Sequence, residues 1–132
     1  MDVEPHLTDL QLAVVRILWE RGEGTVVEVQ EALAPERRLA QTTVATILSR
    51  LEKRRVVRHR TQGRVFVYHA AVTEPQVRQS MVTELTQLLF DGRPAALISH
   101  LLSDREIGAG DLDEVKRLIA DAEERGDAAP AR

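Results

Sequence analysis

Residues 41–68 of the chain read QTTVATILSRLEKRRVVRHRTQGRVFVY. The first half predicts a helix from about Gln41 to Arg54, because its apolar residues fall three or four positions apart and share one helical face. That stripe consists of Val44, Ile47, Leu48 and Leu51. From residue 56 the pattern changes to alternation around a turn at Gln62-Gly63, which predicts a β-hairpin ending at Tyr68. This helix and hairpin are the segment from which the rest of the fold is inferred.

Two further helices are predicted upstream of residue 41. Thr8 followed by Gln11, and Thr25 followed by Glu28, each have the spacing of a capping box. Gly22 is expected to end the first helix and Pro35 the second. Three helices and a hairpin within about 65 residues indicate a winged helix-turn-helix. We therefore expect residues 1–72 to form a winged-helix DNA-binding domain.

More helices are predicted downstream of the hairpin. Thr73 as an N-cap and Pro75 in the first turn indicate a helix starting at Glu74, which Gly92-Arg93-Pro94 ends. A short apolar helix follows, and residues 111–114 carry the N-terminal signal of a last one. We expect a helical dimerisation domain over residues 73–125 and a flexible tail over 126–132. The predicted fold class is mainly α with a small β-hairpin.

The charge of the chain is unevenly distributed. The 132 residues have a formal net charge of −3. Residues 1–72 hold eleven Lys/Arg and nine Asp/Glu, a net charge of +2, whereas residues 73–132 hold seven and twelve, a net charge of −5. Between Arg37 and Arg64 there are nine basic residues and a single acid, Glu52. This basic stretch favours a polyanionic partner, and a solvated charged face is the alternative.

The outward face of the 41–54 helix suits the reading of DNA bases. Short hydroxyl side chains let a backbone approach the floor of the major groove, and arginine can bond guanine or a phosphate. The basic hairpin is expected to contact phosphates as a wing. The candidate DNA-binding residues are Thr42, Thr43, Ala45, Thr46, Ser49, Arg50 and Lys53 on the helix and Arg58, Arg60 and Arg64 on the wing.

The leucine-rich C-terminal part indicates self-association. Three helices in about 55 residues cannot easily bury so much apolar surface alone, so a second copy of the chain is expected to cover it. A two-fold dimer would present two recognition helices to a palindromic operator. The alternative is that these helices fold back onto the N-terminal domain. The candidate dimerisation residues are Val77, Met81, Leu85, Leu88, Leu89, Leu97, Ile98, Leu101 and Leu118.

Several other classes of function find no support in the sequence. The chain has no cysteine, and its four histidines lack the spacing of a metal or catalytic motif, so we expect no enzyme activity, no metal and no cofactor. The N-terminus is acidic and no apolar run approaches about 20 residues, so we expect a cytoplasmic protein without a membrane span. A protein-binding winged-helix adaptor and a small-molecule-responsive regulator, with a pocket between the two halves, stay open as alternatives.

The sequence resembles the penicillinase repressor family, the BlaI/MecI/CopY class, over about residues 7–125. The resemblance is carried by Leu7–Leu12 through Ile17-Leu18-Trp19, by Thr42-Thr43-Val44 through Leu48-Ser49-Arg50-Leu51, and by Gly63–Tyr68. It implies a homodimeric repressor that binds a dyad operator near TACA/TGTA elements. It also implies groove-facing roles for the positions of Thr43, Ala45, Thr46 and Arg50, and a place near the DNA backbone for Arg64.

The chain departs from this family at three places. Members that open the recognition helix with Ser-Pro have a ready N-cap, whereas this chain has Ala40 and Gln41. The resemblance implies a sensor protease as inducer, cutting an Asn-Phe bond, but the matching position here is His100-Leu101. The absence of cysteine excludes the copper-sensing mechanism of another branch.

Overall fold

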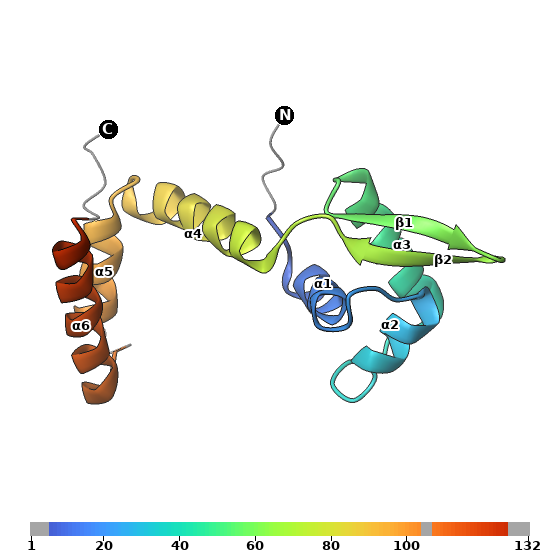
Figure 1. Ribbon diagram of the computed structural model, residues 1–132, viewed down its shortest axis with the longest axis horizontal. Coiled ribbons are helices and arrows are strands. Elements are labelled where there is room, and N and C mark those ends of the chain that lie inside the picture. Colours follow the sequence, from blue (N-terminus) through green and yellow to red (C-terminus); the bar gives the residue numbers. More distant parts are fainter. Residues whose placement is uncertain (1–5, 104–106, 127–132) are drawn as a thin grey trace. The chain divides into compact units, whose positions relative to one another are not determined.

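A computed structural model describes residues 6–103 and 107–126 of the chain. Over these residues it contains helices and one two-stranded antiparallel sheet (Figure 1), which confirms the predicted fold class. In chain order the elements are α1 (Asp9–Arg21), α2 (Val26–Leu33), α3 (Gln41–Lys53), β1 (Val57–Gln62), β2 (Val65–Ala70), α4 (Glu74–Phe90), α5 (Pro94–Ser103) and α6 (Ala109–Arg125).

The chain divides into two compact units within α4. The first unit ends at Leu85 and the second begins at Thr86, so the division falls later than the boundary predicted after residue 72. The physical reason is that the start of α4 belongs to the first core, where Val77 is buried. Trp19 holds the segment before α4 in place by donating its indole N–H to the Val72 carbonyl at 2.9 Å. Val77 was predicted to contact a second copy, and this burial corrects that prediction.

Both predicted capping boxes are present in the first unit. The hydroxyls of Thr8 and Thr25 accept hydrogen bonds from the backbone N–H groups of Gln11 and Glu28, whose side chains accept in return from the two threonine N–H groups. These bonds satisfy amide groups that would otherwise lack a partner at a helix N-terminus. Hydrogen bonds from the backbone and hydroxyl of Thr25 also lower the pKa of Glu28.

The core of the first unit lies between the three helices and the hairpin. From α3 it takes Val44, Leu48 and Leu51, all with no exposed surface, so three of the four predicted stripe residues are fully buried and Ile47 packs against them. Helices α1, α2 and the hairpin contribute the remaining members. The full cluster is Leu7, Val14, Val15, Leu18, Val29, Leu33, Val44, Leu48, Leu51, Val56, Val57, Tyr68, Val72 and Val77.

The hairpin pairs Val57 with Ala70 and Gln62 with Val65. Its two-residue turn is therefore Gly63-Arg64, one residue later than predicted, because Gly63 at φ +64° takes the first turn position, where a positive φ is needed. Gly24 pairs with Tyr68 through two backbone hydrogen bonds of 2.8 and 2.9 Å, which joins the α1–α2 connection to the sheet. Figure 1 shows the turn extending beyond the three helices of this unit.

The second unit contains the end of α4 together with α5 and α6. Helix α6 begins at Ala109 after Gly108, two residues before the predicted start signal at Asp111, and has no side-chain cap. The ring of Phe90 lies 5.7 Å from that of His100, which connects the end of α4 to α5. Among the helices of the described residues, none combines the length and the apolar character that crossing a membrane requires.

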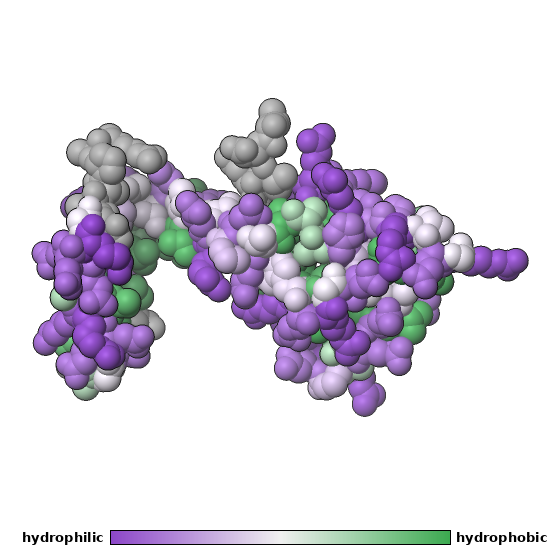
Figure 2. Space-filling view, in the orientation of Figure 1, coloured by the Kyte–Doolittle hydropathy of each residue, from purple (hydrophilic) through white to green (hydrophobic). Residues whose placement is uncertain are grey.

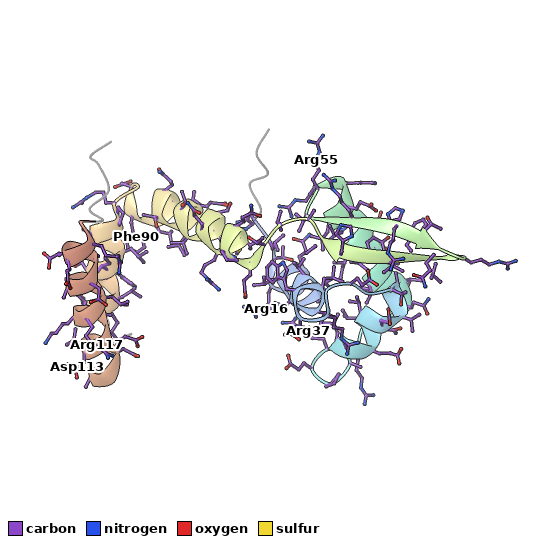
Figure 3. All side chains as sticks on the ribbon, viewed as in Figure 1. Arg16, Arg37, Arg55, Phe90, Asp113 and Arg117 are labelled. Carbon is purple, nitrogen blue, oxygen red and sulfur yellow. The ribbon has the colours of Figure 1, made fainter. Side chains whose placement is uncertain are left out.

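Helix α3 ends in a Schellman motif with an unusual residue. The N–H of Val56 bonds the Leu51 carbonyl and the N–H of Arg55 bonds the Glu52 carbonyl, both at 2.9 Å. Arg55 occupies the left-handed position at φ +66°, where glycine is the usual residue because a Cβ is disfavoured there. Its side chain extends away from the body of the unit (Figure 3).

Replacing Arg55 by glycine is expected to stabilise the protein. Arg55→Gly relieves the left-handed Cβ contact and should raise the free energy of unfolding by about 0.5–1 kcal/mol, measured by urea denaturation. Arg55→Ala is the matched control, because it removes the same charge and keeps the Cβ. Equal stabilities for the two variants would show that the backbone conformation carries no measurable cost.

Candidate nucleic-acid interface

The outward face of α3 carries the residues predicted to contact DNA. Because Val44, Leu48 and Leu51 face the core, a turn of 3.6 residues puts Thr42, Thr46, Ser49 and Lys53 on the opposite side. The remaining predicted residues, Thr43, Ala45 and Arg50, flank this face. All seven are exposed except Ala45, which is half-buried. The helix therefore presents hydroxyl and basic groups together on its solvent side.

The first turn of α3 has no side-chain cap. Ala40 is the N-cap residue, with an extended backbone at φ −66° and ψ 150° and no side-chain hydrogen bond. The departure from a Ser-Pro start therefore has a structural consequence, since the amide N–H groups of the first turn receive no protein side chain. Such groups carry partial positive charge and favour an anion.

Thr46 holds its hydroxyl against its own helix. The Oγ1 atom donates a hydrogen bond to the Thr42 carbonyl at 3.0 Å. This bond uses the single hydroxyl proton, so Thr46 keeps an oxygen that can accept and a methyl group that can make apolar contacts. A residue of this kind on a groove-facing helix suits the 5-methyl group of thymine.

The wing brings three arginines to the hairpin. Arg58 and Arg60 lie on one face of β1, and Arg64 occupies the turn; all three are exposed. The turn end of the hairpin projects as a hydrophilic tip in Figure 2. Arg60 already has partners, since its guanidinium donates to Glu23 at 2.8 Å and to Gln62 at 2.6 Å.

The basic residues between positions 37 and 64 fall into two groups. Arg37 bonds Asp9 at 2.8 Å, and Arg54 donates to the His6 carbonyl at 2.6 Å and to Gln11 at 3.3 Å, as Arg60 does to Glu23. These three arginines form the first group, and their bonds are to other groups of the folded chain. The second group forms no hydrogen bond or ion pair with any other side chain in the described part of the chain. It consists of Arg38, Arg50, Lys53, Arg55, Arg58 and Arg64. The unpaired group contains four of the five basic residues that were predicted to bind DNA, all except Arg60, as well as Arg38 and Arg55.

A cluster at the base of the wing was missed by the sequence analysis. The Nδ1 atom of His59 lies 2.6 and 2.8 Å from the two carboxylate oxygens of Glu52, and its ring stacks on Phe66 with centroids 3.9 Å apart. Burial, and to a lesser extent the nearby Glu52 carboxylate, raises the pKa of Tyr68 in the same cluster. The one available signal was the isolation of Glu52 as a single acid in a basic stretch.

Apolar side chains lie exposed along the end of α4, on α5 and on α6. Leu88 and Leu89 are the most open, at 72% and 70% exposure, and Figure 2 shows apolar atoms near the end of α4 and beside α5. Of the predicted dimerisation residues, Leu85, Leu88, Leu89, Ile98 and Leu118 are exposed, whereas Met81, Leu97 and Leu101 are half-buried and Val77 is buried. The charged side of α6 is marked by Asp113 and Arg117 in Figure 3.

Across residues 6–103 and 107–126, no three side chains of the kinds that ligate metals lie close enough to share an ion. His59 pairs across the hairpin with Tyr68 and His69 with Arg58, so the two histidines are not direct cross-strand partners. The arrangement of unpaired cations and hydroxyls suits contact with a polyanion.

Removing Arg64 should weaken binding to any duplex. Arg64→Ala deletes one unpaired cation, so the slope of log K against log salt should fall in magnitude by about 0.9, as for the loss of one phosphate contact. A salt titration with a random-sequence duplex measures this slope. Arg37→Ala is the control, because Arg37 carries the same charge but is bonded to Asp9. If the two variants change the slope equally, the wing has no special role.

Comparisons with known proteins agree with this geometry. The family model described as penicillinase repressor matches residues 7–121. The transcriptional regulator BlaI of Mycobacterium tuberculosis is 36% identical over 120 residues, which cover 89% of this chain and 86% of the relative. The penicillinase repressor of Bacillus licheniformis is 22% identical over 121 residues, which cover 92% of this chain and 94% of that relative. The solved DNA-binding domain of the repressor BlaI is 30% identical, with a TM-score of 0.51, over 58% of this chain and 93% of that domain.

Proposed function

This chain belongs to the penicillinase repressor family of transcriptional repressors, and we propose that it acts as a homodimer on a palindromic DNA operator. Helix α3 enters the major groove, and the wing contacts the neighbouring backbone. The observation that carries this proposal is the segregation of the basic residues. Within residues 6–103 and 107–126, no side chain pairs with the basic residues that face solvent on α3 and at the wing turn, whereas Arg37 and Arg54 are bonded within the fold.

The similarity to the BlaI DNA-binding domain supports DNA as the partner. That domain matches this chain at 30% identity, and the matched portion is of the size of the first unit. The exposed hydroxyls of α3 supply groups for base edges, and Arg50 supplies a guanidinium that can bond guanine bidentately. Arg58 and Arg64 supply contacts that position the protein without reading sequence.

Exposed leucines support the proposal of a dimer. Leu88 and Leu89 expose more than two thirds of their surface, which is costly in water. A two-fold arrangement of identical patches would cover them and place two α3 helices on one side of a duplex, about 34–36 Å apart. An operator with two half-sites one helical turn apart follows from this symmetry. Enrichment of the genomic DNA that the chain binds would give the nucleotide sequence of this operator.

The structure around His100-Leu101, the position that matches the cleaved bond of the family, does not favour release of the DNA by proteolysis. His100 and Leu101 lie inside α5, which runs from Pro94 to Ser103. A protease binds its substrate in an extended form, so cleavage here would require the helix to unwind. We therefore leave a sensor protease out of the proposed mechanism.

Thr46 is expected to read a thymine through its methyl group. Thr46→Val keeps the methyl and should bind the enriched operator nearly as well as the native protein, whereas Thr46→Ser loses it and should bind about fourfold more weakly, since one buried methyl contributes about 0.8 kcal/mol. Fluorescence anisotropy with short duplexes gives both affinities.

Replacing operator thymines by uracil provides the control, because it removes the partner methyl. The native protein should lose affinity on the uracil duplex and Thr46→Ser should not. A serine variant as sensitive to uracil as the native protein would assign the thymine contact to another residue.

A charge placed among the exposed leucines should separate the dimer. Leu88→Asp would bury a carboxylate in the proposed interface, which is strongly unfavourable without a partner. Mass measurement in solution should therefore report a single chain. Val27→Asp is the control, because it adds the same charge at an exposed apolar residue of the first unit and should leave the dimer intact. A dimeric Leu88→Asp protein would remove α4 from the proposed interface.

A further inference from the structure

We propose that Glu52, His59 and Phe66 form a clamp that holds the wing against α3, which makes Glu52 and His59 positioning residues for DNA binding. This inference rests on the proposed function, because its purpose is to keep the wing arginines and the α3 face on one duplex. None of the three residues needs to touch DNA. The clamp acts by limiting where the wing can point.

The geometry of the clamp is specific. Glu52 comes from the last turns of α3 and His59 from β1, and the Nδ1 atom lies within 2.6 and 2.8 Å of the two carboxylate oxygens. A carboxylate accepts hydrogen bonds only, so Nδ1 carries the hydrogen whether the ring is neutral or charged. The ring stacks on Phe66 of β2 with an interplanar angle of 18°, and Tyr68 closes the cluster with its centroid 5.5 Å from that of His59.

The clamp is placed where the wing leaves the body of the unit. Val57 is buried on the near side, whereas residues 60–65 are all exposed on the far side. A second connection exists between Arg60 and Glu23, but their side chains are 50% and 52% exposed, so water weakens it. The side chains of His59 and Glu52 are only 27% and 32% exposed. The Glu52–His59 pair is therefore the better shielded connection between the wing and its surroundings.

The charge of Glu52 is otherwise hard to explain. It is the one acid among nine basic residues between positions 37 and 64, on a helix proposed to approach phosphates. A free carboxylate there would repel DNA. Both oxygens of this carboxylate are directed at the His59 ring, so the carboxylate has a role inside the protein. That role is to hold the wing in position, which explains why an acid that repels DNA is kept here.

The test compares two variants with the same charge. Glu52→Ala and Glu52→Gln both remove the negative charge, so both gain the same electrostatic attraction to DNA. The glutamine side-chain oxygen can still accept from Nδ1, whereas alanine leaves His59 without a partner. Any difference between them therefore measures the clamp and not the charge. Salt titrations with a random duplex and with the enriched operator are run on both variants and the native chain.

The expected result is a smaller salt slope for Glu52→Ala than for Glu52→Gln. If Arg58 and Arg64 lose their phosphate contacts, the slope falls by about 1.8, and the glutamine variant's advantage shrinks about tenfold between 50 and 200 mM salt. Phe66→Leu, which removes only the stacking ring, should shift the slope in the same direction. Glu23→Ala removes the acceptor of the other wing contact and should not lower the slope, because it leaves the Arg60 cation free for a phosphate. Simple loss of folded protein would lower apparent affinity without changing the slope.

A second measurement tests the clamp without DNA. Backbone amide hydrogen exchange over residues 59–67 should be faster in Glu52→Ala than in Glu52→Gln, with equal exchange in α1. Equal wing exchange and equal slopes in the two variants would overturn the clamp. If the native chain binds no duplex while wing exchange still differs, the proposed function fails and Glu52 holds the wing for some other purpose, which also overturns its role in DNA binding.

Discussion

Burial of one face of α3 sets the orientation of everything that the helix presents to solvent. Val44, Leu48 and Leu51 have no exposed surface, and burying a leucine or valine contributes about 1.5–3 kcal/mol each. Rotating α3 by one residue, about 100°, would expose these side chains and bury hydroxyl groups without partners. The hydroxyl and basic face opposite is therefore fixed by the core, and this face needs no separate structural device to orient it.

Much of the first unit could be predicted because its signals are local. The capping boxes at Thr8 and Thr25 act within four residues, and the stripe of α3 repeats within one helix. Errors arose where distant residues decide the outcome. In the sequence, Val77 falls on the same helical stripe as the apolar residues that follow it in α4. Only the tertiary fold shows that it is buried in the core of the first unit. The Glu52–His59 pair joins a helix to a strand, and no periodicity in the sequence reports such a contact.

Smaller errors have a different origin, in competing local choices. The hairpin turn is displaced by one residue, because Gly63 adopts its positive φ at the first turn position. Helix α6 begins before its acidic signal, at a glycine cap that the sequence does not mark strongly. The exposure of the candidate DNA-binding residues was easier to predict than the contacts of each side chain. Exposure follows from the helical period, whereas the partners of Arg60 and the hydroxyl bond of Thr46 depend on rotamers.

The acids of the first unit explain how an acidic chain can offer a basic surface. Asp9 and Glu23 each take one arginine of the basic stretch, and Glu52 takes His59. Each of these carboxylates is held by a side chain, so it opposes a phosphate less than a free one would. Among the residues that the structure describes, no carboxylate pairs in this way with Arg50, Lys53, Arg58 or Arg64, which face solvent from α3 and the wing. The pairing of these three acids thus sets them apart from the unpaired cations of α3 and the wing, and that contrast does not depend on the net charge of the whole chain.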